Sequence, residues 1–260
     1  MRSIFWFIVL FAGTALFLPE RPNAQSAAVR DLPLAGGGQQ RILYARPVSP
    51  RGTIVMLAGG AGDLGIEADG DLAHGKNFVV RARDMWLAHG YAVVIPDAVG
   101  GENLRGLRSS DGYAHIVEEL VKFAHSTASG PVFLLGTSQG SIAAINGAAH
   151  LSRDELAGLV LTESVSRPSK SGETVFDASP DRVAVPVLIV ANRDSACRVA
   201  PAEDAPRIAA AMTHAPETKV VYVEGGVTRS KDCGSESPHG YLGIESAVVD
   251  QIAAWLDSHG

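Results

Sequence analysis

The sequence predicts an α/β fold with a mostly parallel central sheet and helices on both faces. Continuous apolar runs of the kind found in strands buried on both faces recur along the chain. Amphipathic segments of helical length separate these runs, which is the pattern of successive βαβ units. No internal repeat or linker divides the sequence, so we expect one domain over residues 27–260.

The expected strands are short runs rich in β-branched and aliphatic residues. An edge strand is expected at residues 40–46, where apolar and polar residues alternate. Buried strands are expected at residues 53–58 and 91–95, and further strands at residues 132–135, 159–161, 186–190 and 219–223.

The segments between the strands show helical periodicity. Phe78, Ala82 and Met85 lie on one face of the first, and Val248, Ile252 and Trp255 on one face of the last. The polar interval 163–184 is too short for a large lid domain. Helices are therefore expected at residues 77–89, 111–125, 141–149, 201–212 and 244–256.

The N-terminal residues 1–26 have the features of a signal peptide. Arg2 precedes an apolar run over residues 4–18, and Ala24-Gln25-Ser26 has the small-x-small form that signal peptidase needs. We expect cleavage after Ser26 or at a neighbouring position. The apolar run is shorter than the about 20 residues of a membrane-spanning helix, so no stable span is expected. The mature protein is expected to be exported, periplasmic or secreted from a bacterial cell.

The charge of the chain argues against a nucleic-acid partner. The formal net charge is −6 and the isoelectric point is near 5.7, and no basic stripe is present. The acidic residues within 67–71 lack the further ligands of a calcium loop. We therefore expect neither metal nor cofactor, and a small-molecule or acyl substrate. The oligomeric state stays open.

The segment Gly136-Thr137-Ser138-Gln139-Gly140 matches G-x-S-x-G, with an apolar strand before it and a helix after it. In this turn a serine sits at the tip of a sharp strand-to-helix connection, and small residues allow the two elements to approach. Ser138 is thus the candidate nucleophile. The alternative is an ordinary glycine-rich turn with a serine that caps the helix.

Functional residues of a parallel sheet gather beyond the carboxyl ends of its strands. Ser138, Asp194 and His239 each follow an expected strand, in the order serine, acid, histidine that accompanies G-x-S-x-G. A histidine activates the serine hydroxyl, and a carboxylate orients the imidazole. Asp194 is the preferred acid. Glu163, after the neighbouring strand, is the rival.

The other titratable residues are less well placed for catalysis. Asp97 is expected to brace a turn, and His74 could line the pocket. The remaining histidines fall on expected helices, before the last strand or next to the C-terminus: His89, His115, His125, His150, His214 and His259.

Two backbone N–H groups must face the oxyanion of an acyl-transfer intermediate. Gln139, directly after the nucleophile, is expected to supply one. The run Gly59-Gly60-Ala61-Gly62 follows an expected strand, and Gly60 is the preferred second donor, with Ala61 as the alternative. The run could also be a plain flexible turn.

The chain has two cysteines, Cys197 and Cys233. An exported protein meets an oxidising compartment, and both cysteines fall on loops beside candidate catalytic residues. We expect a disulfide between them that ties the Asp194 loop to the His239 loop. Two free buried thiols are the alternative.

The segments LAGGAG, GYAVVIPD, GTSQG, PVLIVANRD and SPHGYLGIE resemble those of the α/β-hydrolase superfamily over nearly all of residues 27–260. GKNFVVRARDMW, RDSAC and the loop from Cys233 to His239 resemble a little-characterised bacterial branch of small esterase-like members. The resemblance implies the α/β-hydrolase fold, the triad roles given above and esterase-type acyl transfer. The chain differs from the common pattern in having Ala58, and no histidine, before the glycine run.

The expected activity is that of an exported serine hydrolase acting on a carboxylic ester or related acyl bond through an acyl-enzyme intermediate. A peptidase or thioesterase with the same triad is the alternative among enzymes. A binding protein that kept the fold without turnover is the alternative outside enzymes.

Overall fold

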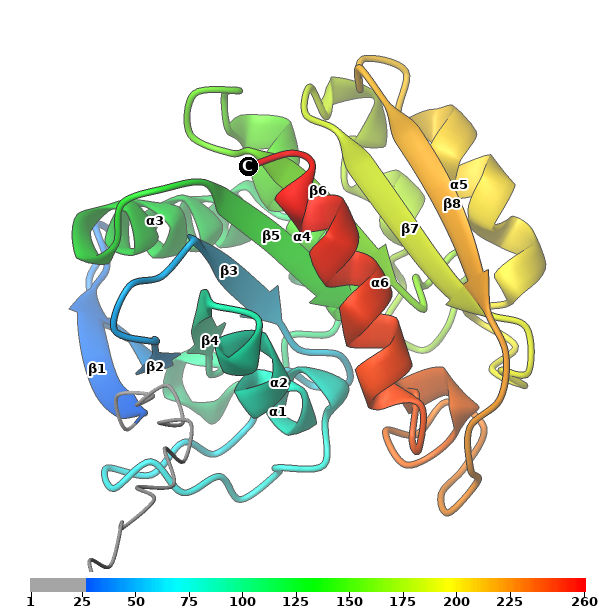
Figure 1. Ribbon diagram of the computed structural model, residues 1–260, viewed down its shortest axis with the longest axis horizontal. Helices are drawn as coiled ribbons and strands as arrows, with labels where there is room; N and C mark the ends of the chain where they lie inside the picture. Colours follow the sequence, from blue (N-terminus) through cyan, green and yellow to red (C-terminus); the bar gives the residue numbers. More distant parts are fainter. Residues whose placement is uncertain (1–26) are drawn as a thin grey trace, which may run out of the picture.

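The computed structural model describes residues 27–260, so the expected signal peptide lies outside the described residues. Eight strands form one sheet in the order β1-β2-β4-β3-β5-β6-β7-β8 (Figure 1). β2 (Gln39–Ala45) pairs antiparallel with both β1 (Ala28–Pro33) and β4 (Tyr91–Pro96). All other strand pairs are parallel. The predicted fold class is therefore confirmed.

The central strands are buried along their whole length, which explains why they read as continuous apolar runs. They are β3 (Gly52–Leu57), β4, β5 (Val132–Thr137), β6 (Gly158–Thr162) and β7 (Val187–Asn192). The edge strand β8 (Thr218–Val223) is partly exposed. The other edge strand, β1, was not predicted, because its sequence AVRDLP carries two charges and has no buried face.

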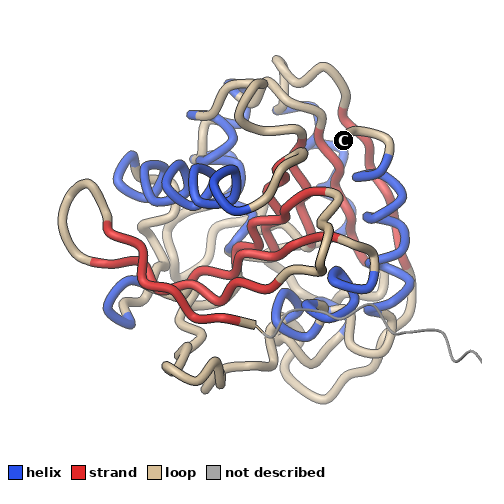
Figure 2. The backbone as a smooth tube through the Cα atoms, turned by 60° about the vertical axis from the view of Figure 1, so that its left-hand side comes forward, coloured by secondary structure: helices blue, strands red, loops and turns tan. Residues whose placement is uncertain are grey.

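Helices cover both faces of the sheet. Figure 1 shows α6 crossing in front of the strands, and Figure 2 shows the twisted sheet with helices on either side of it. One core cluster joins the sheet to α3 (Asp111–Thr127), α4 (Gly140–His150) and α5 (Ala205–Ala211). The other joins it to α1 (Phe78–Arg81), α2 (Arg83–Ala88) and α6 (Glu245–Asp257).

The alternation along β3 shows how the strand feeds both clusters. Val55 and Leu57 belong to the cluster with α3 and α4, whereas Ile54 and Met56 belong to the cluster with α6. Successive side chains of a strand point to opposite faces, so a strand covered on both sides needs apolar residues at every position.

Several helical segments are shorter than the periodicity suggested. The expected helix 77–89 is two helices, α1 and α2, that meet at Ala82. The expected helix 201–212 begins with a 3₁₀ turn, Ala202–Asp204, before α5. The interval 163–184 holds two further 3₁₀ turns, Val175–Asp177 and Pro180–Arg182.

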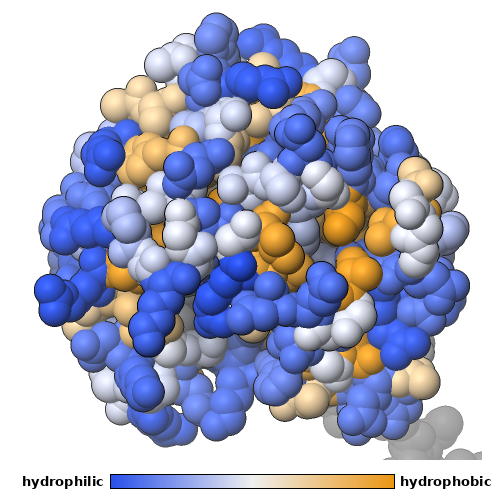
Figure 3. All heavy atoms as spheres, turned by 180° about the vertical axis from the view of Figure 1, so that it is seen from behind, coloured by the Kyte–Doolittle hydropathy of each residue, from blue (hydrophilic) through white to orange (hydrophobic). Residues whose placement is uncertain are grey.

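The large apolar side chains lie almost entirely inside the two clusters. Among the described residues, the exposed large hydrophobic ones are Val48, Leu107 and Val227. The face seen in Figure 3 is mostly hydrophilic, with apolar side chains in small separate groups. Within residues 27–260, no helix has the length and apolar character that crossing a membrane requires.

Candidate active site

Ser138 lies at the sharp turn between β5 and α4, with a left-handed backbone conformation (φ 53°). The flanking glycines are required by packing. A β carbon on Gly140 would collide with the carbonyl of Leu57, and one on Gly136 would collide with the carbonyl of Gly140. The turn can therefore form only with glycine at both positions, and it presents the Ser138 side chain at the carboxyl end of β5.

His239 contacts the Ser138 side chain directly. It lies in a 3₁₀ turn, Pro238–Gly240, between β8 and α6. Its Nε2 is 2.9 Å from Ser138 Oγ, within hydrogen-bond distance. The imidazole is 3% exposed, so this contact is shielded from solvent. The sequence-based choice of His239 as the histidine near Ser138 agrees with this geometry.

The carboxylate next to His239 belongs to Glu163. Its Oε2 is 3.2 Å from His239 Nδ1, and both side chains are almost fully buried. Glu163 directly follows β6 and has a left-handed backbone (φ 48°). Its other oxygen, Oε1, accepts a hydrogen bond of 2.5 Å from the backbone N–H of Asn192. Burial and the neighbouring Glu163 raise the pKa of the Tyr241 hydroxyl, which donates to the carbonyl of Val190.

Asp194, the acid preferred from the sequence, lies away from His239 in this arrangement. Asp194 is exposed, and its Oδ2 accepts a hydrogen bond from the backbone N–H of Gly225 in the loop after β8. Its side chain thus faces β8 and solvent, while Glu163 faces His239. The physical reason is that β7 continues to Asn192 and places a buried N–H where it fixes the Glu163 carboxylate.

Asn192, which no sequence motif singled out, links Glu163 to the loop that carries His239. Its backbone N–H binds Glu163, as above, and its side-chain Nδ2 donates to the carbonyls of Pro238 and Gly225, each at 2.9 Å. The residue is fully buried. Asn192 therefore positions both Glu163 and the residue before His239. The only sequence signal was its place at a strand end.

The loop that carries His239 is held from two further directions. Arg81 of α1 donates to the carbonyls of Gly240 (2.6 Å) and Ser235 (3.0 Å). Cys197 and Cys233 form a disulfide, as the sequence predicted. The disulfide joins this loop to the loop after β7, so both sides of the histidine loop are fixed.

The glycine run after β3 lies against Ser138. A β carbon on Gly59 would be 3.0 Å from Ser138 Cβ, so only glycine allows this approach without a shift. Gly60 lines the cavity at Ser138, whereas Ala61 does not. Within the described residues, the backbone N–H groups of Gly60 and Gln139 make no hydrogen bond.

A buried cation lies beneath this glycine run. Arg108 is 1% exposed, and its Nη2 donates to the carbonyl of Ala58 at 3.3 Å, while its Nη1 has no partner among the described residues. Burial lowers the pKa of its guanidinium. The side chain thus supports the chain where it enters the glycine run.

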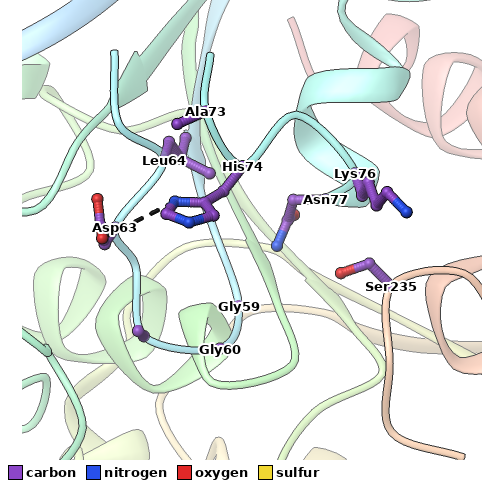
Figure 4. Close-up of a pocket in the computed structure, with 10 residues that line it drawn as sticks. Gly59, Gly60, Asp63, Leu64, Ala73, His74, Lys76, Asn77 and Ser235 are labelled. Carbon is purple, nitrogen blue, oxygen red and sulfur yellow. Dashed lines mark ion pairs between the residues drawn. The ribbon is translucent and has the colours of Figure 1, made fainter. Parts of the chain in front are cut away.

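Two neighbouring cavities lie on the side of the molecule where Ser138 is found, and they share the lining residues Gly59 and Gly60. The smaller, of about 110 Å³, is lined by Ser138, His239 and their neighbours. The larger, of about 520 Å³, contains His74, in agreement with the expectation that this residue could line the pocket (Figure 4). Asp97 accepts hydrogen bonds from the backbone N–H groups of Leu64, Gly65 and Ile66, so it braces the chain here, as expected, next to the cavity wall at Leu64.

The other histidines pair elsewhere. His89 contacts Asp250, and His115 contacts Glu118. His125, His150 and His214 contact backbone carbonyls, and His259 stacks on Trp255. Over residues 27–260, no group of three or more His, Cys, Asp or Glu side chains is arranged to hold a metal ion.

Comparison with solved structures identifies the fold. The esterase Est1E from Butyrivibrio proteoclasticus superposes with a TM-score of 0.62 at 13% identity, over 89% of this chain and 98% of that one. An esterase from Pyrococcus furiosus gives 0.65 at 12% identity, over 90% and 91%. A dienelactone hydrolase from Anabaena variabilis gives 0.61 at 13% identity, over 90% and 99%.

These similar structures are α/β-hydrolases, and the sheet described above has the same architecture. The chain therefore has the α/β-hydrolase fold, as its sequence motifs implied. No protein-family model and no curated protein sequence matches it.

Proposed function

We propose that this protein is an exported serine hydrolase that cleaves a carboxylic ester or related acyl bond with Ser138, His239 and Glu163. One observation carries the proposal: a continuous series of contacts runs from Ser138 Oγ through the imidazole to the buried carboxylate. A serine, a histidine and an acid so connected form the arrangement that activates a hydroxyl for attack on a carbonyl. The similarity to esterases and dienelactone hydrolases supports an ester as substrate.

In the first half of the reaction, His239 Nε2 takes the proton of Ser138 as its oxygen attacks the carbonyl carbon. Glu163 stabilises the imidazolium and holds the Nδ1 proton toward itself. The backbone N–H groups of Gly60 and Gln139 bind the negative oxygen of the tetrahedral intermediate. His239 then donates its proton to the leaving alcohol, and the acyl group stays on Ser138.

In the second half, a water molecule replaces the alcohol. His239 takes a proton from this water, which attacks the acyl carbon. The second tetrahedral intermediate uses the same two N–H donors, and its collapse releases the carboxylic acid and restores the serine hydroxyl. The contacts of Asn192 and Arg81 would keep the imidazole in place through both halves.

Labelling with a fluorophosphonate tests the nucleophile. We expect one label per chain, at Ser138, and none in Ser138→Ala. Ser126→Ala is a matched control, because Ser126 lies at the exposed end of α3 and bonds only the carbonyl of Phe123. An unlabelled wild-type protein that still folds would favour the non-catalytic binding protein.

The bond type is tested by an ester, a thioester and an amide of the same acyl group. We expect kcat/KM to be highest for the ester. Faster turnover of the amide would instead indicate a peptidase, and faster turnover of the thioester a thioesterase.

Export is part of the proposal, and the disulfide supports it, since disulfides persist in oxidising compartments. Expression of the full chain in a bacterial host, followed by fractionation and N-terminal sequencing, tests it. We expect the protein in the periplasm or medium, starting at or near residue 27. Recovery in the cytoplasm with residues 1–26 attached would contradict export.

A further inference from the structure

The cavity at the nucleophile is too small to hold a whole substrate. Its volume of about 110 Å³ is below the roughly 300–1,000 Å³ of ligand pockets. The larger cavity of about 520 Å³ shares four lining residues with it, namely Gly59, Gly60, Asn77 and Ser235. The two form one continuous site, and the larger part of an ester bound at Ser138 would occupy the larger cavity.

Four polar side chains besides that of Lys76 line the larger cavity. They come from three parts of the chain: Asp63 and His74 from the loop after β3, Asn77 from the start of α1, and Ser235 from the His239 loop. Figure 4 shows Asn77 and Ser235 pointing toward the same space, with His74 between Asn77 and Asp63. Groups that can form hydrogen bonds thus converge on the cavity from different sides.

Several of these groups are not committed to other partners. Asn77 uses its Oδ1 to cap α1 at the N–H of Val79, and its amide nitrogen has no partner among the described residues. The hydroxyl of Ser235 is likewise without a hydrogen bond within residues 27–260. Asp63 Oδ2 lies 3.8 Å from His74 Nδ1, which leaves Nε2 of that imidazole open. The cavity therefore offers both donors and an acceptor.

The charges around the cavity select against an anionic group. The carboxylate of Asp63 disfavours an anion, and its close partners are the backbone N–H of Gly65 and the imidazole of His74. The ammonium group of Lys76 points away from the cavity in Figure 4 and pairs with Glu236 at 2.7 Å. An alkyl chain would cover the polar groups without hydrogen-bonding to them, which is unfavourable. A hydroxyl both donates and accepts, so it matches this lining.

Part of the cavity wall is also preformed. Asp97 fixes the backbone of Leu64 and Ile66 through hydrogen bonds of 2.7 Å each. A wall that is rigid before binding loses little conformational entropy when a ligand enters. The small side chains of Ala61 and Ala73 and the glycines provide contact for the C–H groups of a polyol.

We propose that the larger cavity binds a neutral, hydroxyl-bearing part of the substrate, so that the enzyme acts on esters of polyol or sugar-like compounds. This inference rests on the proposed function, because it names the substrate class for hydrolysis at Ser138. Asp63, His74, Asn77 and Ser235 are the residues that recognise the hydroxyl groups.

Paired substrates of matched carbon skeleton test the proposal. Glycerol monoacetate is compared with propyl acetate, a pair that differs in hydroxyl groups on the alcohol side of the ester. Methyl gluconate is compared with methyl hexanoate, a pair that differs in hydroxyl groups on the acyl side. We expect kcat/KM to be about tenfold higher for the hydroxylated member of one pair, and the pair concerned identifies the half of the ester that lies in the cavity.

Substitutions of cavity residues test whether the preference for hydroxylated esters arises in the larger cavity. His74→Ala and Ser235→Ala should each lower the ratio of kcat/KM between the hydroxylated and alkyl esters about threefold to tenfold, as the loss of one hydrogen bond predicts. His115→Ala is the control for His74, since both imidazoles are mostly exposed beside a carboxylate. Ser230→Ala is the control for Ser235, on the same loop but outside both cavities. Both controls should keep the wild-type ratio.

Different outcomes would refute the substrate class and the hydrolase activity. A protein that is labelled at Ser138 and cleaves propyl acetate, but prefers the alkyl member of both pairs, overturns the substrate class and leaves the hydrolase proposal intact. A preference for hydroxylated esters that is unchanged in both His74→Ala and Ser235→Ala also overturns the proposed substrate class. Absence of labelling and of turnover on all four esters refutes the hydrolase proposal itself.

Discussion

Two residues of the site have unusual backbone conformations. Ser138 and Glu163 are the first residues after β5 and β6, and both have φ near 50°. A left-handed conformation costs a residue other than glycine about 1–2 kcal/mol. Hydrogen bonds offset this cost: the N–H of Ser138 binds the carbonyl of Thr162, and the N–H of Glu163 binds that of Val190. The left-handed conformation directs both side chains toward His239.

The identity of the acid gives the most direct prediction. Glu163→Gln should lower kcat about 10²–10⁴-fold, because a neutral amide neither stabilises the imidazolium nor fixes its tautomer. Asp194→Asn should change kcat less than threefold, since the carboxylate of Asp194 contacts only the N–H of Gly225. Steady-state kinetics on one short-chain ester measures both. The opposite order would restore Asp194 as the acid.

Asn192 is predicted to act as a positioning residue. Asn192→Ala keeps the N–H that binds Glu163 but removes the two bonds to the carbonyls of Pro238 and Gly225. We expect kcat to fall about tenfold with little change in KM, because the imidazole loses alignment and the substrate contacts remain.

Thermal unfolding and the pH profile of kcat of Asn192→Ala distinguish an effect on the position of the imidazole from an effect on the stability of the fold. A lower melting temperature with wild-type kcat would mean that Asn192 only stabilises the fold.

At the scale of elements, the site depends on the pairing of neighbouring strands. β6 lies between β5 and β7, so a residue just after β6 is close both to the end of β5 and to the N–H of the last residue of β7. The loop after β7 extends toward β8, where Asp194 binds Gly225. Which carboxylate lies next to His239 therefore depends on whether the loop after β6 or the loop after β7 points toward it. The direction of each loop depends on contacts between neighbouring strands.

The disulfide joins the loop after β7 to the histidine loop, and its reduction should lower activity before the protein unfolds. The bridge closes a loop of 36 residues, which corresponds to about 4 kcal/mol in the chain-entropy model. Without it, Arg81 and Asn192 still hold part of the loop.

Activity and far-UV circular dichroism are followed during titration with a reductant, and the double variant Cys197→Ser with Cys233→Ser serves as a reagent-free comparison. Full activity after complete reduction would show that the bridge does not position His239.

At the scale of the molecule, eight strands and the helices on both faces bring distant segments to one edge of the sheet. Ser138, Glu163 and His239 are separated by 25 residues and then by 76 in the sequence. The rigid core of buried strands fixes them relative to one another, and the cavities open between loops that follow those strands.

The ion pair between Arg167 and Asp204 should make a contribution to the stability of the chain that depends on pH in the acid range. Asp204 accepts hydrogen bonds from Arg167 and Ser166, which lower the pKa of its carboxyl. A carboxyl with a lowered pKa in the folded state contributes stability above its unfolded pKa of about 4, and this contribution is lost as the pH falls through the folded value.

Urea unfolding of Asp204→Asn and wild type from pH 7 to pH 3 measures this contribution. The variant should have the lower midpoint at pH 7, and the difference should shrink below about pH 4. A difference that is constant with pH would exclude the linkage.

Much of this protein could be predicted from its sequence because the signals are local. The buried strands, the glycines around Ser138 and the order of the functional segments depend on neighbours in the chain, through burial on both faces and the close approach of β5 to α4. The glycine requirement at positions 136 and 140 is one example, since no other residue fits there.

The choice between Glu163 and Asp194, the role of Asn192 and the lining of the larger cavity were decided by tertiary structure alone. Each depends on where a side chain points after several strands have paired, and a change of one or two residues in a strand end redirects it. The sequence by itself determined the fold and the choice of Ser138 and His239 as candidate site residues, because strand burial and turn geometry are encoded locally. The contact of Glu163 with His239 and the lining of the larger cavity were set by contacts between segments far apart in the chain, which no local pattern records.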